Sequence, residues 1–586
     1  MKKKLIILLI ALTSNLIFGQ ITTDKNIRYT KALKERLFIH YNSSVVLAGE
    51  NLHYKVYCIR DRNNKLSLLS KVAYVHLIND ENKIIVTQKI RLQQGKGSGS
   101  YAVPRTLATG HYKLVAYTQW MRNEGDTYFF KGDIVVVNLF DENQLFSVHK
   151  TSSLAKNILL RKENTTPISV NTNGNISINL PKKTYKSREK VNLKIVTGQS
   201  GSFFGNYSLS VRKIDQISKP KEITVLDYIN IYKNQESKNN YGKEVKFLPE
   251  FKGSTLTGKV TNIKTKEPVA NTKVVLSVSD KKYKFRFAIT NSEGIFTFVF
   301  KRPNTDKNVI LQIVDKKKEK YRLSIINKPQ FIPNKLIFKK VEIHPNIKNI
   351  LLERHINNQI EQAYVKDIKD PLAFDPFIDE EMLRNTTNYY LDDYHRFATL
   401  KETIVEIIKS VWITKRKGNY IFHVRKRNPY DYETTKESPL VIIDGVFIQD
   451  YNKIVEFDAS EIKKISVVKR RLSYSDYVFE GIVFIETFDK NYKKDSFSNY
   501  LKNVTLIVPK LGKDINRKYS TSNFSEENIP DYRNQLLWKP NLEIEQTTTY
   551  SNFFTSDVTG TFEILLEGFN KKGTPVFLKT IFNVTK

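Results

Sequence analysis

Residues 253–280 are GSTLTGKVTNIKTKEPVANTKVVLSVSD, and residues 288–300 are AITNSEGIFTFVF. Apolar and polar residues alternate through both stretches, which is typical of strands with one buried and one exposed face. Pro268 and Asn271 favour a turn between two such strands, and the sequence NSEG at 291–294 favours a tight hairpin. This segment therefore predicts a small β-sandwich.

The same alternation over short runs separated by turn residues extends along most of the chain. We therefore expect a mainly β protein made of tandem β-sandwich modules plus one small α/β domain. The expected units are a signal peptide at 1–20, sandwiches at 21–145, 165–250 (with a linker), 251–330 and 500–586, a helical or irregular connector at 331–395, and an α/β domain at 396–492.

The N-terminus has the layout of a secretory signal peptide. Lys2, Lys3 and Lys4 precede an apolar run at 5–18, which is shorter than the roughly 20 residues that span a bilayer. No cysteine lies near the expected cleavage position, so we expect an exported chain without a lipid anchor or a membrane span. Cys58 is the only cysteine, and we expect it to be a small buried residue on a strand.

The chain is strongly basic, with a formal net charge of +35 and a pI of about 9.7. Such a surface suits an anionic partner such as lipopolysaccharide, an acidic protein or nucleic acid. The basic residues are spread from Lys25 to Lys586 rather than gathered into one block. Because the chain is expected to be exported, we expect no nucleic-acid partner.

Within the first unit we expect strands at 100–103, 111–118 and 127–138, and a connecting loop at the three glycines of 95–99. Residues 217–244 are polar and lysine-rich and predict a linker. Residues 504–508 predict a strand that pairs within the C-terminal sandwich.

The pattern changes period after the third sandwich. Apolar residues at helical spacing predict helices at 345–365 and 399–411, the second with a capping box formed by Thr399 and Glu402. Strands at 420–424 and 440–443, a turn at Asp444-Gly445, a second helix near 459–462 and strands through Val467 and Ile485 complete an α/β plan.

Several segments resemble known domain families. RLFIHYNSSVVLAGENLHYKVYC at 36–58 resembles a macroglobulin-type domain, and ISINLPKKTYKSREKVNLKI at 176–195 repeats that pattern. Residues 253–300 resemble the carboxypeptidase regulatory-like domain, a transthyretin-like sandwich without peptidase activity. Residues 439–487, PLVIIDGVFIQDYNKIVEFDASEIKKISVVKRRLSYSDYVFEGIVFIET, resemble the plug of TonB-dependent outer-membrane transporters.

Together these domains resemble a family of exported multidomain Bacteroidota proteins. A transporter barrel needs 22 strands, or roughly 220 residues, after the plug, and we expect none after Thr487. The resemblance therefore implies association with the outer membrane, at the cell surface or in the periplasm, through an outer-membrane β-barrel protein or its complex.

The sequence offers no catalytic constellation. No histidine is followed by glutamate three residues later, as zinc carboxypeptidases require. GQSGS at 198–202 lacks the final glycine of a nucleophile elbow, and Cys58 has no glutamine nearby for the thioester of protease-trapping macroglobulins. We therefore expect no enzyme and no catalytic, cofactor-binding or metal-binding residue.

The candidate partner-binding residues lie in the plug-like region. They are Lys463, Lys464, Lys469, Arg470, Arg471 and Asp444. The alternative is a structural role, because lysines on a strand edge also prevent unwanted pairing and an Asp-Gly pair favours a turn.

The leading hypothesis is a non-catalytic exported scaffold or accessory subunit of an outer-membrane complex for transport, secretion or outer-membrane protein assembly. The alternative is a glycan-binding protein or an enzyme with a site between modules, because the chain contains 34 Phe and 31 Tyr.

Overall fold

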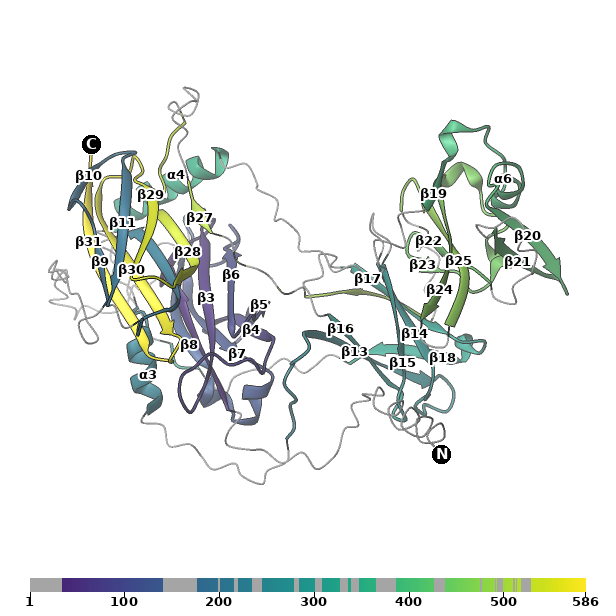
Figure 1. The fold of residues 1–586 in the computed structure, drawn as a ribbon, viewed down its shortest axis with the longest axis horizontal. Helices are drawn as coiled ribbons and strands as arrows, with labels where there is room; N and C mark the ends of the chain where they lie inside the picture. The colour runs from purple at the N-terminus through teal and green to yellow at the C-terminus, as the bar shows by residue number, and fades with distance from the viewer. Residues whose placement is uncertain are drawn as a thin grey trace, which may run out of the picture.

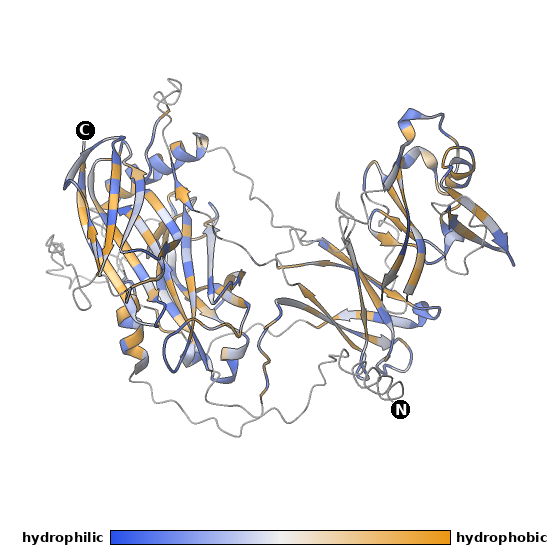
Figure 2. Ribbon diagram, in the orientation of Figure 1, coloured by the Kyte–Doolittle hydropathy of each residue, from blue (hydrophilic) through white to orange (hydrophobic). Residues whose placement is uncertain are grey.

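The computed structural model describes the residues 34–140, 176–198, 201–214, 220–233, 245–278, 284–300, 308–326, 336–338, 347–364, 386–425, 438–474, 477–490, 492, 499–507, 509, 512, 514–517 and 529–586. The predicted signal peptide lies outside them. These residues form mainly strands, which confirms the predicted fold class, and they lie in two lobes (Figure 1). Figure 2 shows that apolar residues are concentrated on the strands of both lobes.

The first sandwich is built from residues 34–140. One sheet has the order β1 (Glu35–Tyr41), β3 (Asn51–Arg60), β6 (Lys96–Ala102). The other has the order β2 (Val45–Leu47), β8 (Phe130–Val137), β7 (Gly110–Tyr117), β4 (Val72–Asn79), β5 (Ile84–Arg91). Cys58 is buried, as predicted. The loop predicted at the glycines is wrong in part, because Gly97 and Gly99 lie in β6. A Cβ at Gly97 would lie 2.5 Å from the carbonyl oxygen of Arg91, so close packing requires glycine there.

The second sandwich is discontinuous in sequence. One sheet has the order β10 (Thr184–Lys186), β31 (Pro575–Thr585), β30 (Gly560–Asn570), β12 (Gly205–Lys213), β28 (Gln535–Ile544), β27 (Ile515–Asn516), and the other has β29 (Thr548–Phe554), β11 (Lys190–Thr197), β9 (Ile176–Asn179). The two sandwiches predicted at 165–250 and 500–586 are therefore one. β12 lies between β28 and β30 and buries Tyr207, Leu209 and Val211 completely, so neither half has a complete core alone.

The third sandwich confirms the strands predicted from residues 253–300. One sheet has the order β16 (Ile295–Phe300), β13 (Ser254–Asn262), β18 (Tyr321–Ile325). The other has the order β15 (Lys284–Ile289), β14 (Lys273–Val278), β17 (Asn308–Val314), β26 (Leu501–Thr505). β26 was predicted to pair in the C-terminal sandwich, and this is wrong: Val504 pairs with Val309. The hairpin at 291–294 is confirmed, with Gly294 at φ +73°.

The α/β domain is a five-stranded sheet with the order β19 (Thr386–Tyr390), β24 (Ile462–Tyr474), β25 (Tyr477–Thr487), β22 (Leu440–Ile443), β23 (Val446–Phe447). One face packs against helix α6 (Leu400–Glu406) and the hairpin β20 (Val411–Arg416)–β21 (Asn419–Val424). The capping box of Thr399 and Glu402 is confirmed, but the helix ends at Glu406, and the second helix predicted near 459–462 is a 3₁₀ turn at Ala459–Glu461.

The opposite face of this sheet packs on the third sandwich. Val275 of β14 belongs to one apolar cluster with Ile442, Phe479 and Phe484 of the sheet. The amide of Gln312 donates a hydrogen bond of 2.8 Å to the carbonyl oxygen of Phe447. The third sandwich and the α/β domain are therefore packed together as one lobe.

Two helices cover the other lobe. Helix α3 (Val225–Lys233) lies where a linker was predicted, and Val225 and Tyr228 are buried in the core of the first sandwich. Helix α4 (Lys348–Tyr364) confirms the helix predicted at 345–365. Its Arg354 forms two hydrogen bonds of 2.7 Å with Glu50 of the first sandwich.

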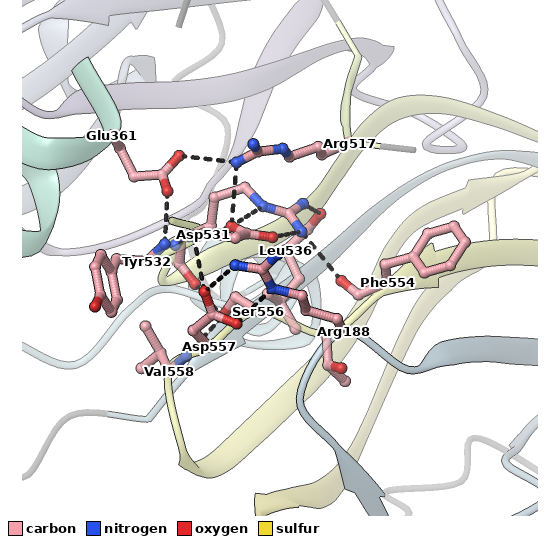
Figure 3. A network of polar contacts seen from close by, with 12 residues as sticks. Arg188, Glu361, Arg517, Asp531, Tyr532, Leu536, Phe554, Ser556, Asp557 and Val558 are labelled. Carbon is pink, nitrogen blue, oxygen red and sulfur yellow. Dashed lines mark hydrogen bonds and ion pairs between the residues drawn. The ribbon is translucent and has the colours of Figure 1, made fainter. Parts of the chain in front are cut away.

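The C-terminal end of α4 contacts the second sandwich (Figure 3). Glu361 accepts a hydrogen bond of 2.6 Å from the backbone N–H of Tyr532 and lies 3.7 Å from Arg517, which also lies 3.6 Å from Asp531. Burial raises the pKa of Glu361. Helix α4 therefore holds the first two sandwiches together.

Candidate interaction site on the α/β domain

Strand β24 carries the five basic residues predicted to bind a partner. Its register with β25 shifts between Ile462 and Lys464 and again between Val468 and Arg471, so each shift adds one residue to β24. Lys463 lies in the first bulge, and Lys469 and Arg470 lie at the second. All three side chains are exposed, because a bulge redirects side chains out of the regular alternation.

The other two basic residues pair with glutamates on β25. Lys464 lies 3.5 Å from Glu486, and Arg471 lies 3.4 Å from Glu480. Lys464 and Arg471 are seven positions apart along the strand, which corresponds to roughly 23 Å of extended chain. The predicted residues therefore form two separate basic groups rather than one patch.

Asp444 lies in the interior and has a structural role. It is 6% exposed, and its carboxylate accepts hydrogen bonds from the backbone N–H of Thr487 at 2.9 Å and of Tyr492 at 3.2 Å. Asp444 and Gly445 both have positive φ, at +46° and +86°, as expected for the predicted turn. Asp444 is therefore not part of a partner-binding surface, and this correction removes it from the candidate site.

Aromatic residues that the sequence did not single out lie beside the first basic group. Tyr390 of β19 and Phe488 are 49% and 48% exposed. The Lys464 ammonium lies 5.8 Å from the centre of the Tyr390 ring, and the Arg396 guanidinium lies 5.4 Å from that of Phe488. Such distances permit cation–π attraction. We call Tyr390, Arg396, Lys463, Lys464 and Phe488 the basic–aromatic surface.

The strand register explains how this surface assembles. Tyr390 on β19 is paired with Lys464 on β24, which is paired with Glu486 on β25. Arg396 is fixed by three hydrogen bonds from its Nη1 to backbone carbonyl oxygens near the start of β24, of which the shortest, 2.9 Å, goes to Ala459. Only this pairing brings the separate segments together, so a sequence pattern could not have revealed it.

A second polar group deserves comparison with a catalytic site. His40 Nδ1 of β1 lies 2.6 Å from Ser208 Oγ of β12, and His40 Nε2 lies 3.8 Å from a carboxylate oxygen of Glu567 on β30. The order Ser–His–Glu resembles that of a hydrolase. Ser208 is completely buried between the first and second sandwiches, so no substrate could reach its hydroxyl.

The electrostatics of this buried polar cluster agree with a structural role. Burial raises the pKa of Glu567 to about 8, and burial together with Arg212 lowers the pKa of His40 to about 3. At neutral pH, Glu567 is therefore mainly a neutral acid and His40 a neutral imidazole. Arg212 forms ion pairs of 2.5 Å with Glu563 and 2.8 Å with Glu222. Burial lowers the pKa of Arg212, but these two carboxylates raise it by more.

Within the part of the chain that the structure describes, no group of three or more His, Cys, Asp or Glu residues is placed to hold a metal ion. No described helix has both the length and the apolar composition needed to cross a bilayer.

The fold defines a mainly β, multidomain sandwich protein. No protein-family model and no curated protein sequence matches it. Among solved structures, it is similar to Salmonella alpha-2-macroglobulin reacted with methylamine, with 9% identity and a TM-score of 0.24 over 94% of this chain and 40% of that chain. It is also similar to trypsin-activated alpha-2-macroglobulin from Escherichia coli, with 9% identity and a TM-score of 0.23 over 94% of this chain and 41% of that chain.

The adhesin InvE of Yersinia pseudotuberculosis gives 9% identity and a TM-score of 0.13 over 50% of this chain and 58% of that chain. This chain thus spans about two fifths of the length of the macroglobulins. Scores this low identify neither a family nor a function.

Proposed function

We propose that this chain is a non-catalytic, exported scaffold or accessory subunit of an outer-membrane protein complex, and that it binds its partner through the α/β domain. The observation that carries the proposal is the basic–aromatic surface. Its aromatic residues Tyr390 and Phe488 are half exposed beside Arg396 and Lys464.

The packing of the α/β domain supports this choice of surface. α6 and the β20–β21 hairpin cover one face of its sheet, and the third sandwich covers much of the other. The basic–aromatic surface lies where β19, β24 and the end of β25 meet, at the end of β24 opposite to Leu472, which packs toward the third sandwich. A partner could therefore contact it without displacing either layer.

The composition of this surface suits a protein partner. Tyr, Phe and Arg are enriched in the buried centres of protein interfaces, where a few residues contribute most of the binding energy. Lys463 adds positive charge, and a chain with a net charge of +35 favours an acidic partner. The plug resemblance of residues 439–487 makes an outer-membrane β-barrel protein the partner that we propose.

The test is affinity purification of the full chain from detergent-solubilised outer membranes of its own host. We expect an integral β-barrel protein to co-purify. The variant Lys463→Glu, Tyr390→Ala, Phe488→Ala should lose it. The control Lys190→Glu, Lys194→Glu, Tyr550→Ala also changes three exposed residues, with a larger change of charge, but in the second sandwich, and should retain it. Recovery of the chain alone, or equal loss in both variants, would refute the proposal.

A second candidate is glycan binding at the β20–β21 hairpin. Trp412 and His423 stack with ring centres 5.0 Å apart and planes at 15°, both partly exposed, and Thr414 Oγ1 lies 2.8 Å from His423 Nε2. A flat aromatic pair could stack against a sugar ring, and Arg416 at the end of the same strand, β20, adds a positive charge that suits an acidic sugar. Binding to an array of anionic polysaccharides that Trp412→Ala abolishes would favour this function, and an array without any binding would exclude it.

A further inference from the structure

Lys55 of β3 is a lysine with no contact to solvent. Its side chain is 0% exposed, whereas lysine is almost never fully buried unless it is paired. Its ammonium nitrogen donates a hydrogen bond to the side-chain oxygen of Asn541 on β28 and lies 5.5 Å from the centre of the Tyr57 ring. The contact joins the first sandwich to the second.

The local structure of β28 positions Asn541 for this contact. Tyr207 of β12 pairs with Leu542 and Leu209 pairs with Lys539, so β28 contains one extra residue at Pro540 or Asn541. A bulge of this kind redirects a side chain, and proline inside a strand is typical of such a position. Asn541 is exposed on its other side.

The surroundings of Lys55 favour a nucleophilic amine. Burial, together with the nearby charge of Lys96, lowers the pKa of Lys55 to about 7. A large fraction is therefore neutral at physiological pH, and a neutral lysine is the reactive form. Asp514 is close enough for its charge to act on Lys55, and burial raises the pKa of its carboxyl group, so an acid that can exchange protons is at hand.

The geometry points to an intramolecular isopeptide bond between Lys55 Nζ and Asn541 Cγ that covalently links the first and second sandwiches. The neutral amine attacks the amide carbon, and a new C–N bond forms as the bond to the amide nitrogen breaks. The proton that the attacking amine loses passes to the leaving nitrogen, and Asp514 is an acid whose charge acts on Lys55. Ammonia leaves through the exposed side of Asn541, and no oxidant or reductant is needed.

Such a bond would act at the interface between the two sandwiches of this lobe. The first and second sandwiches are otherwise held together by non-covalent contacts, namely the buried polar cluster, helix α4 and ion pairs such as that of Lys96 with Glu543 at 3.0 Å. A covalent link across the interface prevents them from separating under load or after partial unfolding. This inference is independent of the partner and of the proposed function.

The test is mass spectrometry of the full purified chain. We expect an intact mass about 17 Da below that of the processed sequence, the mass of one ammonia, and a peptide map in which the peptides of Lys55 and Asn541 are joined. Asn541→Ala and Lys55→Met should keep the full mass and give separate peptides.

Cyclisation of an N-terminal Gln20 would also release ammonia, but it would persist in Asn541→Ala. Full mass in the wild-type chain after incubation at about pH 8, or a loss that survives in Asn541→Ala, would overturn the proposal. The joined peptides of Lys55 and Asn541 in the wild-type map distinguish the two sources of ammonia without any variant, so misfolding of a variant does not prevent a decision.

Discussion

Replacing Glu567 with glutamine should remove a specific pH dependence from the stability of the paired sandwiches. Glu567 is 4% exposed, and one carboxylate oxygen accepts a hydrogen bond of 2.5 Å from the backbone N–H of Val225. Glutamine keeps an oxygen for that hydrogen bond but cannot titrate. The comparison therefore isolates the carboxyl group.

The sign and size of the effect follow from the pKa of Glu567, which burial raises from 4.5 to about 8. The folded protein holds a proton that the unfolded chain releases, so the stabilisation is complete below pH 4.5 and is lost as the pH rises through 8. One pKa unit corresponds to about 1.4 kcal/mol. From pH 6 to pH 8, the wild type should therefore lose about 2 kcal/mol relative to Glu567→Gln.

Other titrating groups do not disturb this difference. His40 has a pKa lowered to about 3, and its contribution rises with pH between this value and the pKa of a histidine in the unfolded chain. His40 is present in wild type and variant, so its contribution cancels in the comparison.

The assay is urea unfolding at several pH values between 6 and 8, followed by tryptophan fluorescence. Trp538 is a suitable reporter because it is buried and its ring centre lies 5.2 Å from that of His40. If wild type and Glu567→Gln show the same change of unfolding free energy with pH, Glu567 is ionised in the folded protein and the account of the buried polar cluster is wrong.

Three further substitutions probe other parts of the fold. Gly568→Ala should reduce the free energy of unfolding by about 2 kcal/mol and so lower the urea midpoint, because the new Cβ would lie 2.7 Å from the Tyr57 hydroxyl oxygen. An unchanged midpoint would contradict this packing. Glu361→Ala leaves the N–H of Tyr532 without its acceptor, costs about 2 kcal/mol, and should speed proteolysis within 347–364. Equal cleavage rates in wild type and variant would argue against a role of Glu361 in holding helix α4 on the second sandwich. Thr399→Ala removes the capping box, costs about 1 kcal/mol, and should accelerate amide exchange at 400–406; unaltered exchange would show that packing alone holds the helix.

The alternation of residues was enough to predict the mainly β fold, and local signals were enough for several details. The hairpin at 291–294, the capping box of Thr399 and the turn at Asp444-Gly445 depend on residues within a few positions of one another. Such interactions are encoded locally, so they can be recognised in a sequence. The helix at 225–233 was missed because its surroundings are polar and only its buried face, with Tyr228 and Val225, shows its role.

Domain membership required the tertiary structure. The alternation in 176–213 and in 535–585 predicts strands with one apolar face, but it does not say which strand lies alongside. β12 finds its neighbours β28 and β30 near the end of the chain, and β26 pairs with β17. Strand pairing uses backbone hydrogen bonds that are the same for every residue type, so partner choice depends on the packing of the whole core.

The candidate site shows the same division. The sequence by itself determined that basic residues cluster along 463–471 and that Asp444 begins a turn, because both are properties of neighbouring residues. The tertiary structure alone decided that Asp444 is buried, that bulges expose Lys463, and that Tyr390 and Phe488 lie beside Lys464 and Arg396. It also decided that Lys55 meets Asn541. Exposure and contact between distant residues arise only when the chain folds, because they depend on which surfaces other segments cover.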